Sequence, residues 1–435
     1  MIDSVNERAV VLDLLLLVNK DGEQLHKVLN GALERFEYLD KSARSFISRL
    51  TRGTIEKQIT LDYYLNQISK TPMKDCKPVI RELLRMSAYQ ILYMEQVPNH
   101  AAINEAVKLA AEKSFGTLKG FVNGVLRNLE RNQDTLALPK REKSVKRYLS
   151  VVYSVPAWIV GEFLAQFGEE KTEDVLKAFS MENMTYIRVN TAKITPGSLK
   201  TRLEAEGVTV RHKEGWPEYT FALSQYDYLA GIESFQDGLF YVQDLSSALA
   251  GVESGIKPGD TVLDVCSAPG GKAINAALLA GEHGTVIARD LSEDKVMMIE
   301  DNMFRLGLDN IRTEVQDACV FCDSDCEKYD VVLADLPCSG LGDLGRKPDV
   351  RYRVTKEDVE SLAALQAEIL KNACQYVKSG GTLVYSTCTL TRPENTLNTE
   401  NFLNEHPDFI KVKEQTLLPG EASDGFYYCR MQRKD

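Results

Sequence analysis

The apolar positions of the first 130 residues recur every three or four residues. The spacing is clear at Val10, Leu14 and Leu17, and again at Leu83, Leu84, Ala88 and Leu92. Such stripes are typical of amphipathic helices. Turn-forming residues at 21–22, 53, 71–72 and 98–99 divide the segment. The pattern predicts a compact bundle of six or seven helices, ending near residue 140.

A basic stretch from Pro139 to Arg147 follows the predicted bundle. It favours a solvated linker, and a phosphate contact stays open as the alternative. Beyond it, the strand-like runs Tyr186–Asn190 and Val208–Val210 are mixed with helical segments and glycine turns. Residues 141–235 are therefore predicted to form a small α+β connecting domain.

From about residue 236, strands alternate with helical segments rich in Ala, Leu and Glu. The candidate strands are Thr261–Val265, Thr285–Ala288, Ile311–Val315, Val331–Ala334 and Thr382–Ser386. This alternation predicts an α/β domain over residues 236–435, with a parallel sheet covered by helices on both faces. Ligands of such sheets bind beyond the carboxyl ends of the strands, so the residues that follow each strand are the candidates for function.

Length and composition suit a soluble protein of two or three domains, with 435 residues, 44% of them hydrophobic and 26% charged. The N-terminal apolar run Val10–Val18 is broken by Asp13 and is too short to span a membrane, so we expect a cytoplasmic protein without a membrane partner. The net charge of −11 is unevenly distributed. Residues 1–150 carry 24 basic and 18 acidic residues (+6), whereas the remainder carries 28 and 45 (−17). This asymmetry favours a basic RNA-facing module joined to an acidic enzyme body.

The first strand of the α/β domain runs into a glycine-rich turn, from Asp264 to Lys272. The paired glycines allow the backbone to approach a ligand, and the helix that follows offers N–H groups to an anion. Cys266 and Ala273 exclude a phosphate-binding P-loop, because that motif requires Gly and Ser or Thr at these positions. The second and third strands lead to Asp290 and Asp317. An acidic residue after the second strand suits a nucleoside ribose, although Asp290 as a helix cap stays open.

The fourth and fifth strands deliver Asp335, Cys338 and Cys388 to the same predicted edge. Two thiols beside a carboxylate favour covalent chemistry, and two ordinary reduced cysteines are the alternative. A basic stretch with one aromatic residue follows the fourth strand and contains Arg346, Lys347, Arg351 and Arg353. It predicts contact with an RNA backbone and base stacking on Tyr352, and a solvated loop stays open.

Several of these runs resemble the RNA cytosine-C5 methyltransferases of the NOL1/NOP2/Sun family. They are residues 264–272, 335–340, 386–388 with Glu394-Asn395, Gln243-Asp244 and 424–426. The helical N-terminus resembles the NusB-type RNA-binding domain, in residues 97–98, 103–107 and 120–127. Ser267, Leu336 and Thr389 depart from the residues expected at these positions, and none of them touches a reacting atom.

The resemblance implies a NusB-like all-α domain, the α+β connecting domain and a Rossmann-like class I methyltransferase domain that uses S-adenosyl-L-methionine (AdoMet). It places the cofactor against Cys266, Ser267, Ala268, Pro269, Gly270, Gly271, Lys272, Asp290, Asp317 and Asp335. It makes Cys388 the nucleophile at cytosine C6, gives Cys338 the breakdown of the adduct, and sets Asp335 against the cytosine edge. Lys272 either takes part in catalysis or braces the loop. The implied substrate is 16S ribosomal RNA, at position 967 by family analogy, and the expected enzyme is a monomer.

Other interpretations stay open at this point. Without a second cysteine, Cys338 would be the nucleophile, as in DNA cytosine-C5 enzymes. The substrate is alternatively a tRNA, or the chain is an RNA-binding assembly or antitermination factor with a vestigial methyltransferase half. Cys319, Cys322 and Cys326 are spaced like a metal site, but a fourth ligand and paired histidines are missing from the sequence pattern, so no metal is predicted. The nine cysteines are expected to be reduced.

Overall fold

The computed structural model describes residues 5–181, 184–420 and 424–435. The chain forms two compact units, which are described separately. The helical unit extends to Ser180 and also contains Arg346–Arg353 from much later in the chain. The sheet unit contains the described residues of Met181–Gly345 and Val354–Asp435.

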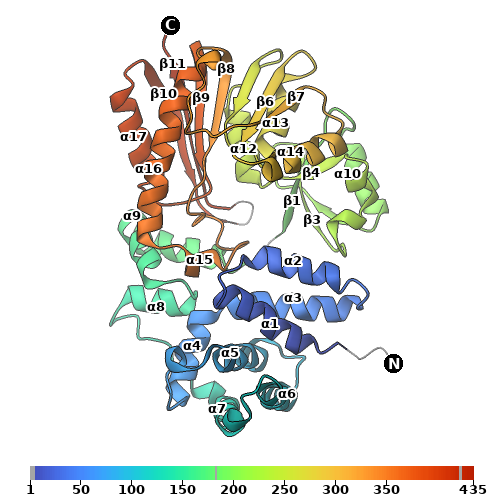
Figure 1. Ribbon diagram of the computed structural model, residues 1–435, viewed down its shortest axis with the longest axis vertical. Helices are drawn as coiled ribbons and strands as arrows, with labels where there is room; N and C mark the ends of the chain where they lie inside the picture. Colours follow the sequence, from blue (N-terminus) through green and yellow to red (C-terminus); the bar gives the residue numbers. More distant parts are fainter. Residues whose placement is uncertain (1–4, 182–183, 421–423) are drawn as a thin grey trace. The chain divides into compact units, whose positions relative to one another are not determined.

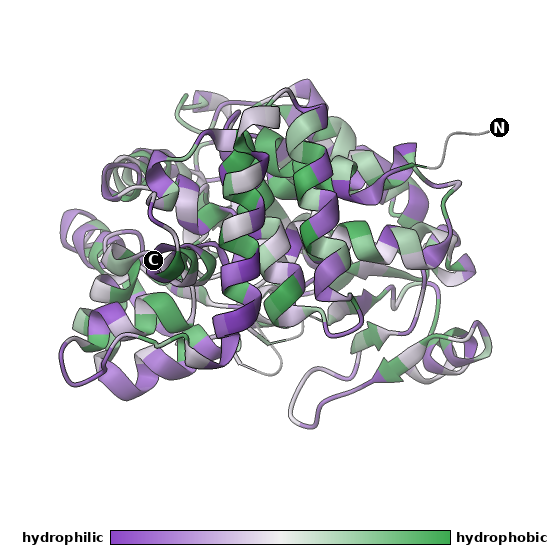
Figure 2. Cartoon of the chain, turned by 90° about the horizontal axis from the view of Figure 1, so that it is seen from below, coloured by the Kyte–Doolittle hydropathy of each residue, from purple (hydrophilic) through white to green (hydrophobic). Residues whose placement is uncertain are grey.

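The helical unit is a bundle around one apolar core (Figure 1). Its α-helices are α1 (Glu7–Asn19), α2 (Leu25–Arg35), α3 (Lys41–Glu56), α4 (Gln58–Ile68), α5 (Pro78–Tyr93), α6 (Asn99–Glu112), α7 (Lys119–Asn132), α8 (Val145–Val152), α9 (Ala157–Ala178) and α15 (Val350–Arg353). The predicted six or seven helices of the first 130 residues are α1 to α7. Figure 2 shows hydrophobic and hydrophilic residues divided along the same helices. The hydrophobic ones, such as Leu12, Leu50 and Leu83, are fully buried, and their burial is the main stabilising contribution.

The inserted segment Arg346–Arg353 is an integral part of the helical unit. Arg351 is only 1% exposed, and its Nη1 donates to the carbonyl oxygens of Tyr153 (3.3 Å) and Ser154 (3.1 Å). The buried Asp349 accepts the N–H of Leu25 at 3.2 Å, at the start of α2. These contacts join backbone groups of α2 and of the α8–α9 connection through one segment, which follows α2 by 324 residues and the α8–α9 connection by nearly 200.

The sheet unit begins with a four-stranded antiparallel sheet. Its strands are β1 (Thr185–Val189), β2 (Thr209–Arg211), β3 (Thr220–Ser224) and β4 (Phe240–Val242), in the order β2-β3-β1-β4. The helices that accompany it are α10 (Pro196–Ala205) and α11 (Glu233–Gln236). Ile187 and Val189 of β1 pack with Leu199 and Leu203 of α10 in its core. The sheet thus includes β4, which lies beyond residue 235.

A seven-stranded sheet forms the remainder of the sheet unit, in the order β10-β11-β9-β8-β5-β6-β7. Its strands are β5 (Thr261–Asp264), β6 (Thr285–Asp290), β7 (Ile311–Val315), β8 (Tyr329–Asp335), β9 (Val377–Thr387), β10 (Phe409–Leu417) and β11 (Phe426–Arg433). β5 to β9 pair in parallel and correspond to the five predicted strands. β10 and β11 pair antiparallel at one edge and were not predicted, so the sheet is mixed.

Helices cover both faces of this sheet (Figure 1). They are α12 (Leu245–Glu253), α13 (Gly271–Ala280), α14 (Glu293–Leu306), α16 (Lys356–Ala373) and α17 (Thr396–Glu405). Side chains of α13 and α14 share one hydrophobic cluster with alternate residues of β5, β6 and β8. Side chains of α16 and α17 share the other with the intervening strand residues. The predicted arrangement of helices on both faces is confirmed.

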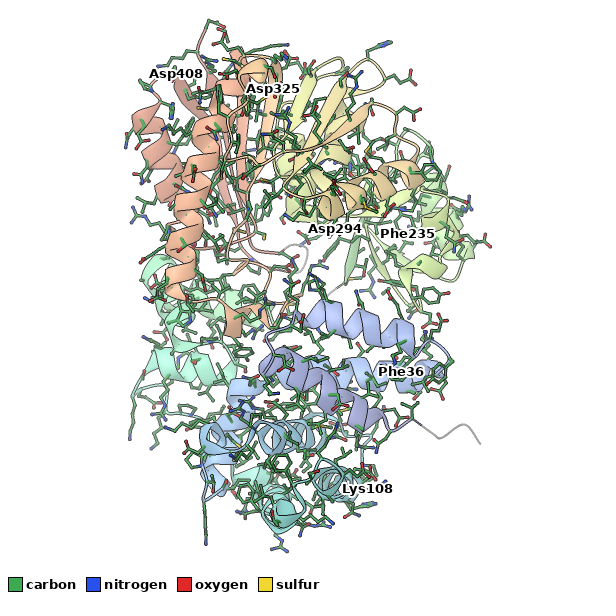
Figure 3. All side chains as sticks on the ribbon, viewed as in Figure 1. Phe36, Lys108, Phe235, Asp294, Asp325 and Asp408 are labelled. Atoms are coloured by element: carbon green, nitrogen blue, oxygen red, sulfur yellow. The ribbon has the colours of Figure 1, made fainter. Side chains whose placement is uncertain are left out.

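The two sheets of this unit are joined by polar contacts of Arg305 and Asn190. The Arg305 guanidinium lies 3.9 Å from the ring centre of Phe235, which is labelled in Figure 3, and donates to the carbonyl oxygens of Phe235 and Phe240. Asn190 Nδ2 donates to the carbonyl oxygens of Gly238 and Leu306, each at 2.9 Å. These bonds fix the smaller sheet against α14.

Within the described residues, no single helix is long and apolar enough to cross a membrane. The pair α8 and α9 passes a test of length and composition only when taken together, and it is bent by 120°.

Replacing Arg351 tests the contribution of the inserted segment to the helical unit. Arg351→Ala removes two donors from buried carbonyl groups and leaves a cavity. We expect a loss of about 2–4 kcal/mol in the free energy of unfolding. Urea denaturation followed by circular dichroism measures it. The matched control is Arg353→Ala, because Arg353 is exposed and its ion pair with Asp349 is worth about 0–1 kcal/mol. Equal midpoints for the two variants would contradict a structural role for Arg351.

Candidate active site

The order of strands reverses between β5 and β8, which lie side by side at the centre of the larger sheet. Asp264 ends β5 and pairs in register with Leu333 of β8. Asp335 ends β8 and pairs in register with Ser386 of β9. Parallel pairing therefore brings the carboxyl ends of three neighbouring strands together at the position where such sheets bind ligands.

Two thiols meet at this edge. The Sγ atoms of Cys338 and Cys388 lie 3.2 Å apart, and both side chains are partly exposed. The hydrogen bond to Cys388, together with burial, raises the pKa of the Cys338 thiol. With its pKa raised, Cys338 is a neutral thiol near neutral pH, and it lies in hydrogen-bond contact with the Cys388 sulfur.

The loop after Cys338 is held against Cys388 through a glycine. Gly342 donates its N–H to the Cys388 carbonyl at 3.0 Å and accepts from Gly425 N at 2.8 Å. A Cβ on Gly342 would lie 2.1 Å from the Gly425 carbonyl oxygen, so only glycine fits. This close approach links the two cysteine loops to the start of β11.

Asp335 lies beside the thiols, and each of its two carboxylate oxygens accepts a hydrogen bond. Its Oδ2 accepts from Lys272 Nζ at 2.6 Å, and its Oδ1 accepts from Ser386 Oγ at 2.7 Å. Lys272 also lies over the ring of Phe426, with Nζ 5.0 Å from the ring centre. The ammonium group and the hydroxyl fix the orientation of the carboxylate.

The glycine-rich loop between β5 and α13 is held by its neighbour strand. Ser267 N donates to the Arg289 carbonyl at 2.8 Å, and Ala268 N donates to Asp290 Oδ2 at 2.9 Å. Gly270, with φ +103°, begins α13 without a capping side chain. The first N–H groups of α13 therefore have no side-chain cap and suit an anionic group of a ligand.

The two predicted ribose-site acids lie in different surroundings. Asp290 is 4% exposed and accepts from Leu291 N and Lys295 Nζ. The cap of α14 is Ser292, so Asp290 is not the helix cap that the sequence left open. Asp317 is exposed and accepts the N–H of Cys319 at 2.9 Å.

Asp264 is a carboxyl group that sequence reasoning did not single out. It is fully buried, and neither oxygen has a hydrogen-bond partner within the described part of the chain. Burial and the charge of Asp335 raise its pKa to about 7, against the opposing effect of Lys272. A buried acid next to the glycine-rich loop has no pattern of its own in the sequence, because many strands end in Asp.

Glu394 and Asn395 bracket both cysteine loops, although the sequence gave them no role. Glu394 is fully buried and accepts from Ser339 N (2.7 Å), Ser339 Oγ (2.6 Å) and Thr391 Oγ1 (2.6 Å). Asn395 accepts from Thr387 Oγ1 at 2.5 Å and donates to the Thr389 carbonyl at 2.9 Å. Ser339 follows Cys338, and Thr387 and Thr389 flank Cys388. The pair of residues thus positions the backbone on which both thiols stand.

The basic residues predicted to contact RNA have different fates. Lys347 and Arg353 are exposed, and Arg346 is partly exposed. Arg351 is buried in the helical unit, where its guanidinium donates to backbone carbonyl groups. The prediction that Arg351 contacts RNA is therefore wrong. In the earlier basic stretch, Arg141 forms ion pairs with Glu169 and Glu173 of α9.

The three clustered cysteines lie in the segment that follows β7. Cys322 Sγ is 3.1 Å from Ser324 Oγ, and Cys326 is exposed. Among the described residues, no group of three His, Cys, Asp or Glu side chains is arranged to hold a metal ion.

Three protein families match successive parts of the chain. Residues 255–432 match the family described as 16S rRNA methyltransferase RsmB/F. Residues 5–131 match the NusB family, and residues 155–223 match the ferredoxin-like domain of RsmF/B-like methyltransferases.

Relatives of similar length are alike over nearly the whole chain. The probable ribosomal RNA small subunit methyltransferase B of Bacillus subtilis (strain 168) is 34% identical, with 98% of each chain covered. The ribosomal RNA small subunit methyltransferase B of Shigella boydii serotype 4 is 30% identical, with 99% of each chain covered.

Solved structures share the fold. The protein PH0851 has a TM-score of 0.83 and 23% identity over 99% of both chains. NSun6 from Pyrococcus horikoshii, solved with SFG, has a TM-score of 0.59 and 22% identity, covering 64% of this chain and 98% of that one.

The raised pKa of Asp264 predicts a pH-dependent cost to stability. The folded state binds a proton up to about pH 7, whereas an unfolded Asp releases it near 3.8, so stability falls as pH rises between these values. Asp264→Asn stays neutral. We expect its melting temperature to exceed that of the wild type at pH 8 and the difference to shrink toward pH 4. Scanning calorimetry at a series of pH values measures this. The exposed Asp309→Asn is the control, and parallel curves for wild type and Asp264→Asn would contradict the assignment.

Glu394→Gln, an isosteric change, tests the hydrogen bonds that the buried Glu394 carboxylate accepts from Ser339 and Thr391. The Gln amide replaces one carboxylate oxygen, an acceptor, with an NH2 group, a donor. Because the hydroxyl and N–H groups around residue 394 donate, this NH2 group faces other donors. We expect a loss of about 2–3 kcal/mol of stability and faster alkylation of Cys338 by iodoacetamide. Denaturation and mass spectrometry of the Cys338 peptide measure these effects. Glu400→Gln, a largely exposed residue of α17, is the control. Unchanged stability and unchanged alkylation would exclude a positioning role.

Proposed function

The chain belongs to the 16S rRNA methyltransferase RsmB/F family, and from this premise we propose that it methylates C5 of a cytosine in 16S ribosomal RNA through a covalent cysteine adduct. Family membership makes it an AdoMet-dependent RNA methyltransferase with a NusB domain, a ferredoxin-like domain and a Rossmann-like catalytic domain. The choice of C5 and the adduct are the finer proposals. The observation that carries them is the 3.2 Å separation of the Cys338 and Cys388 sulfur atoms beside Asp335.

The glycine-rich edge of the sheet suits AdoMet. The buried Ser267 Oγ has no partner among the described residues, and the uncapped first turn of α13 faces a loop built for close backbone approach. We assign the cofactor to the loop Cys266–Lys272 and to Asp290, Asp317 and Asp335. When bound, AdoMet supplies an electrophilic methyl group on a sulfonium.

Covalent help is needed because C5 of cytosine is a poor nucleophile. Addition of a thiolate at C6 converts the ring to an enamine whose C5 is nucleophilic, which divides one difficult step into easier ones. We assign this attack to Cys388, the role that the family resemblance implies, and the raised pKa of the neighbouring Cys338 is consistent with that role. Cys338 then assists the breakdown of the adduct. A base removes the proton from C5, the electron pair of that C–H bond re-forms the C5–C6 double bond, and the Cys388 sulfur leaves as a thiolate.

Asp335 is the group we place against the N3 edge of cytosine. A carboxyl group there stabilises the charge that develops as C6 is attacked. Its ion pair with Lys272 and its bond from Ser386 hold it in one orientation before substrate binds. The 2.6 Å contact favours bracing of Asp335 as the role of Lys272.

The substrate base has to be unpaired or flipped out, because a thiol cannot reach C6 inside a duplex stack. We assign Arg346, Lys347 and Arg353 to contacts with the RNA backbone. A ribosomal RNA substrate is consistent with the expected cytoplasmic location, and the expected monomer needs no second subunit to complete the site.

Single cysteine variants test the proposal. Incubated with AdoMet and small-subunit ribosomal RNA, Cys338→Ala is expected to accumulate a covalent protein–RNA band on a denaturing gel, because it forms the adduct and fails to resolve it. Cys388→Ala is expected to form no band and to lose methyl transfer by at least about a thousandfold.

The controls separate mechanism from substrate. Cys374→Ala, at a buried cysteine that caps the C-terminal end of α16, should transfer methyl groups like the wild type. A band with Cys388→Ala instead of Cys338→Ala would reverse the two roles. Methylation of tRNA in place of ribosomal RNA would overturn the substrate, and absence of transfer to either RNA would overturn the proposed function.

A further inference from the structure

We propose that a pocket on the four-stranded sheet binds one nucleotide of the RNA strand beside the target cytosine, its base against Tyr186 and Trp216 and its phosphate toward Arg211 and Lys213. The proposal deepens the proposed function and rests on it for the identity of the strand. The ligand class is a nucleotide within single-stranded RNA.

The pocket has the size and the walls for a base. Its volume is about 360 Å³, and its floor is the face of the sheet opposite α10. Tyr186 of β1 pairs in register with Ala222 of β3, and both line the pocket. Leu245, the first residue of α12, closes one side. A flat apolar floor with an open mouth suits a planar ring.

Two aromatic side chains flank this floor. Trp216, from the turn between β2 and β3, packs with Tyr186, Ala222 and Leu245 in one apolar cluster and is partly exposed. Aromatic rings at open pockets are the platforms on which proteins stack unpaired bases, and such stacking accepts any base. A partly exposed tryptophan over a sheet is therefore suited to a nucleotide whose identity is not read.

The rim of the pocket is cationic. Arg211 and Lys213 are exposed on either side of His212, and Glu214 is the one acidic lining residue. This local positive charge stands out in a part of the chain that is strongly acidic, since residues after 150 carry 28 basic and 45 acidic residues. Exposed cations around an aromatic floor match a phosphate attached to a base.

A buried guanidinium lies on the same face of the sheet. Arg188 is 3% exposed, two residues from Tyr186 on β1, and in register with the pocket residue Thr220 of β3. Its Nε and Nη1 have no hydrogen-bond partner within the described ranges, and its guanidinium lies 4.2 Å from the centre of the Tyr219 ring. Two unsatisfied nitrogens on a buried guanidinium are costly, and an acceptor that reached this face of the sheet would offset that cost.

The pocket is tied to the methylation site by a short stretch of chain. Two residues before Leu245, Gln243 donates to the Gly271 carbonyl of the cofactor loop at 2.9 Å. Asp244 caps α12 and accepts the N–H of Asp424, beside the strand that carries Phe426. The pocket and the glycine-rich loop are thus connected through two residues of the chain, and the occupant we assign is a nucleotide that flanks the target base.

The two tryptophans of the chain allow a direct readout that does not depend on activity. In a Trp158→Phe background, Trp216 is the single tryptophan. Titration with a single-stranded oligoribonucleotide of about ten nucleotides is expected to quench its fluorescence, because a stacked base quenches indole emission. Arg211→Ala with Lys213→Ala is expected to weaken binding about tenfold and to lower the salt slope by about 2. Lys200→Ala, at an exposed lysine of α10, is the matched control and should bind like the parent.

The arms of the experiment separate the possible failures. If the wild type methylates ribosomal RNA but Trp216 fluorescence stays constant and the double variant binds like Lys200→Ala, the pocket proposal is overturned and the proposed function stands. If quenching and the double-variant effect occur without methyl transfer to ribosomal RNA, the pocket binds RNA and the proposed function fails. If cytidine monophosphate saturates the pocket at the same concentration as the oligonucleotide, the site takes free nucleotides, and the strand-binding proposal is overturned.

Discussion

The parallel register of β8 against β5 and β9 is the constraint on which the site depends. It sets Asp335 beside Ser386 and places Asp264 one strand away, so that the loops leaving the three strands emerge at one edge. A shift of one residue would turn Asp335 to the opposite face of the sheet. The positions of the thiol pair, the Lys272 contact and the glycine-rich loop all depend on the backbone hydrogen bonds between these strands. None of the side chains of the site takes part in those bonds.

Buried polar groups translate this register into a fixed active-site geometry. Glu394 and Asn395 form hydrogen bonds with the residues that follow or flank the two cysteines. Gly342 adds backbone hydrogen bonds to Cys388 and Gly425, which lie so close that no side chain fits at its position. Such groups contribute little net stability when fully paired, but an unpaired member is costly, so the network tolerates few alternative arrangements. Asp264 is the exception, since it is buried without a partner among the described residues and has a raised pKa. The edge thus combines a rigid thiol pair with an acid whose charge responds to pH near neutrality.

The sequence predicted the elements whose pattern is local. The five parallel strands were found because they are short runs with β-branched residues that alternate with helical segments, and the residues at their ends followed from the general rule for such sheets. β10 was missed because most of its side chains are exposed, which gives no apolar run or clear alternation. The burial of Arg351 could not be predicted, because its carbonyl partners lie nearly 200 residues away in sequence. The hydrogen bonds of Glu394 could not be predicted either, because Ser339 and Glu394 lie in separate loops that the pairing of β8 with β9 brings together.

The composition of the helical unit from two distant segments has a consequence for how the chain folds as it is made. During synthesis, α1 to α9 emerge well before Arg351, which donates to Tyr153 and Ser154, and Asp349, which accepts from Leu25. At about 5–20 residues per second, the missing segment arrives roughly 10–30 s later, after much of the larger sheet has been translated. The N-terminal bundle therefore stays incomplete until residues 346–353 have been synthesised. A chain that ends before Arg346 yields a bundle without the contacts that this segment makes. The helical unit at the N-terminal end of the chain reaches its final form only after the loop that follows Cys338 has also been made.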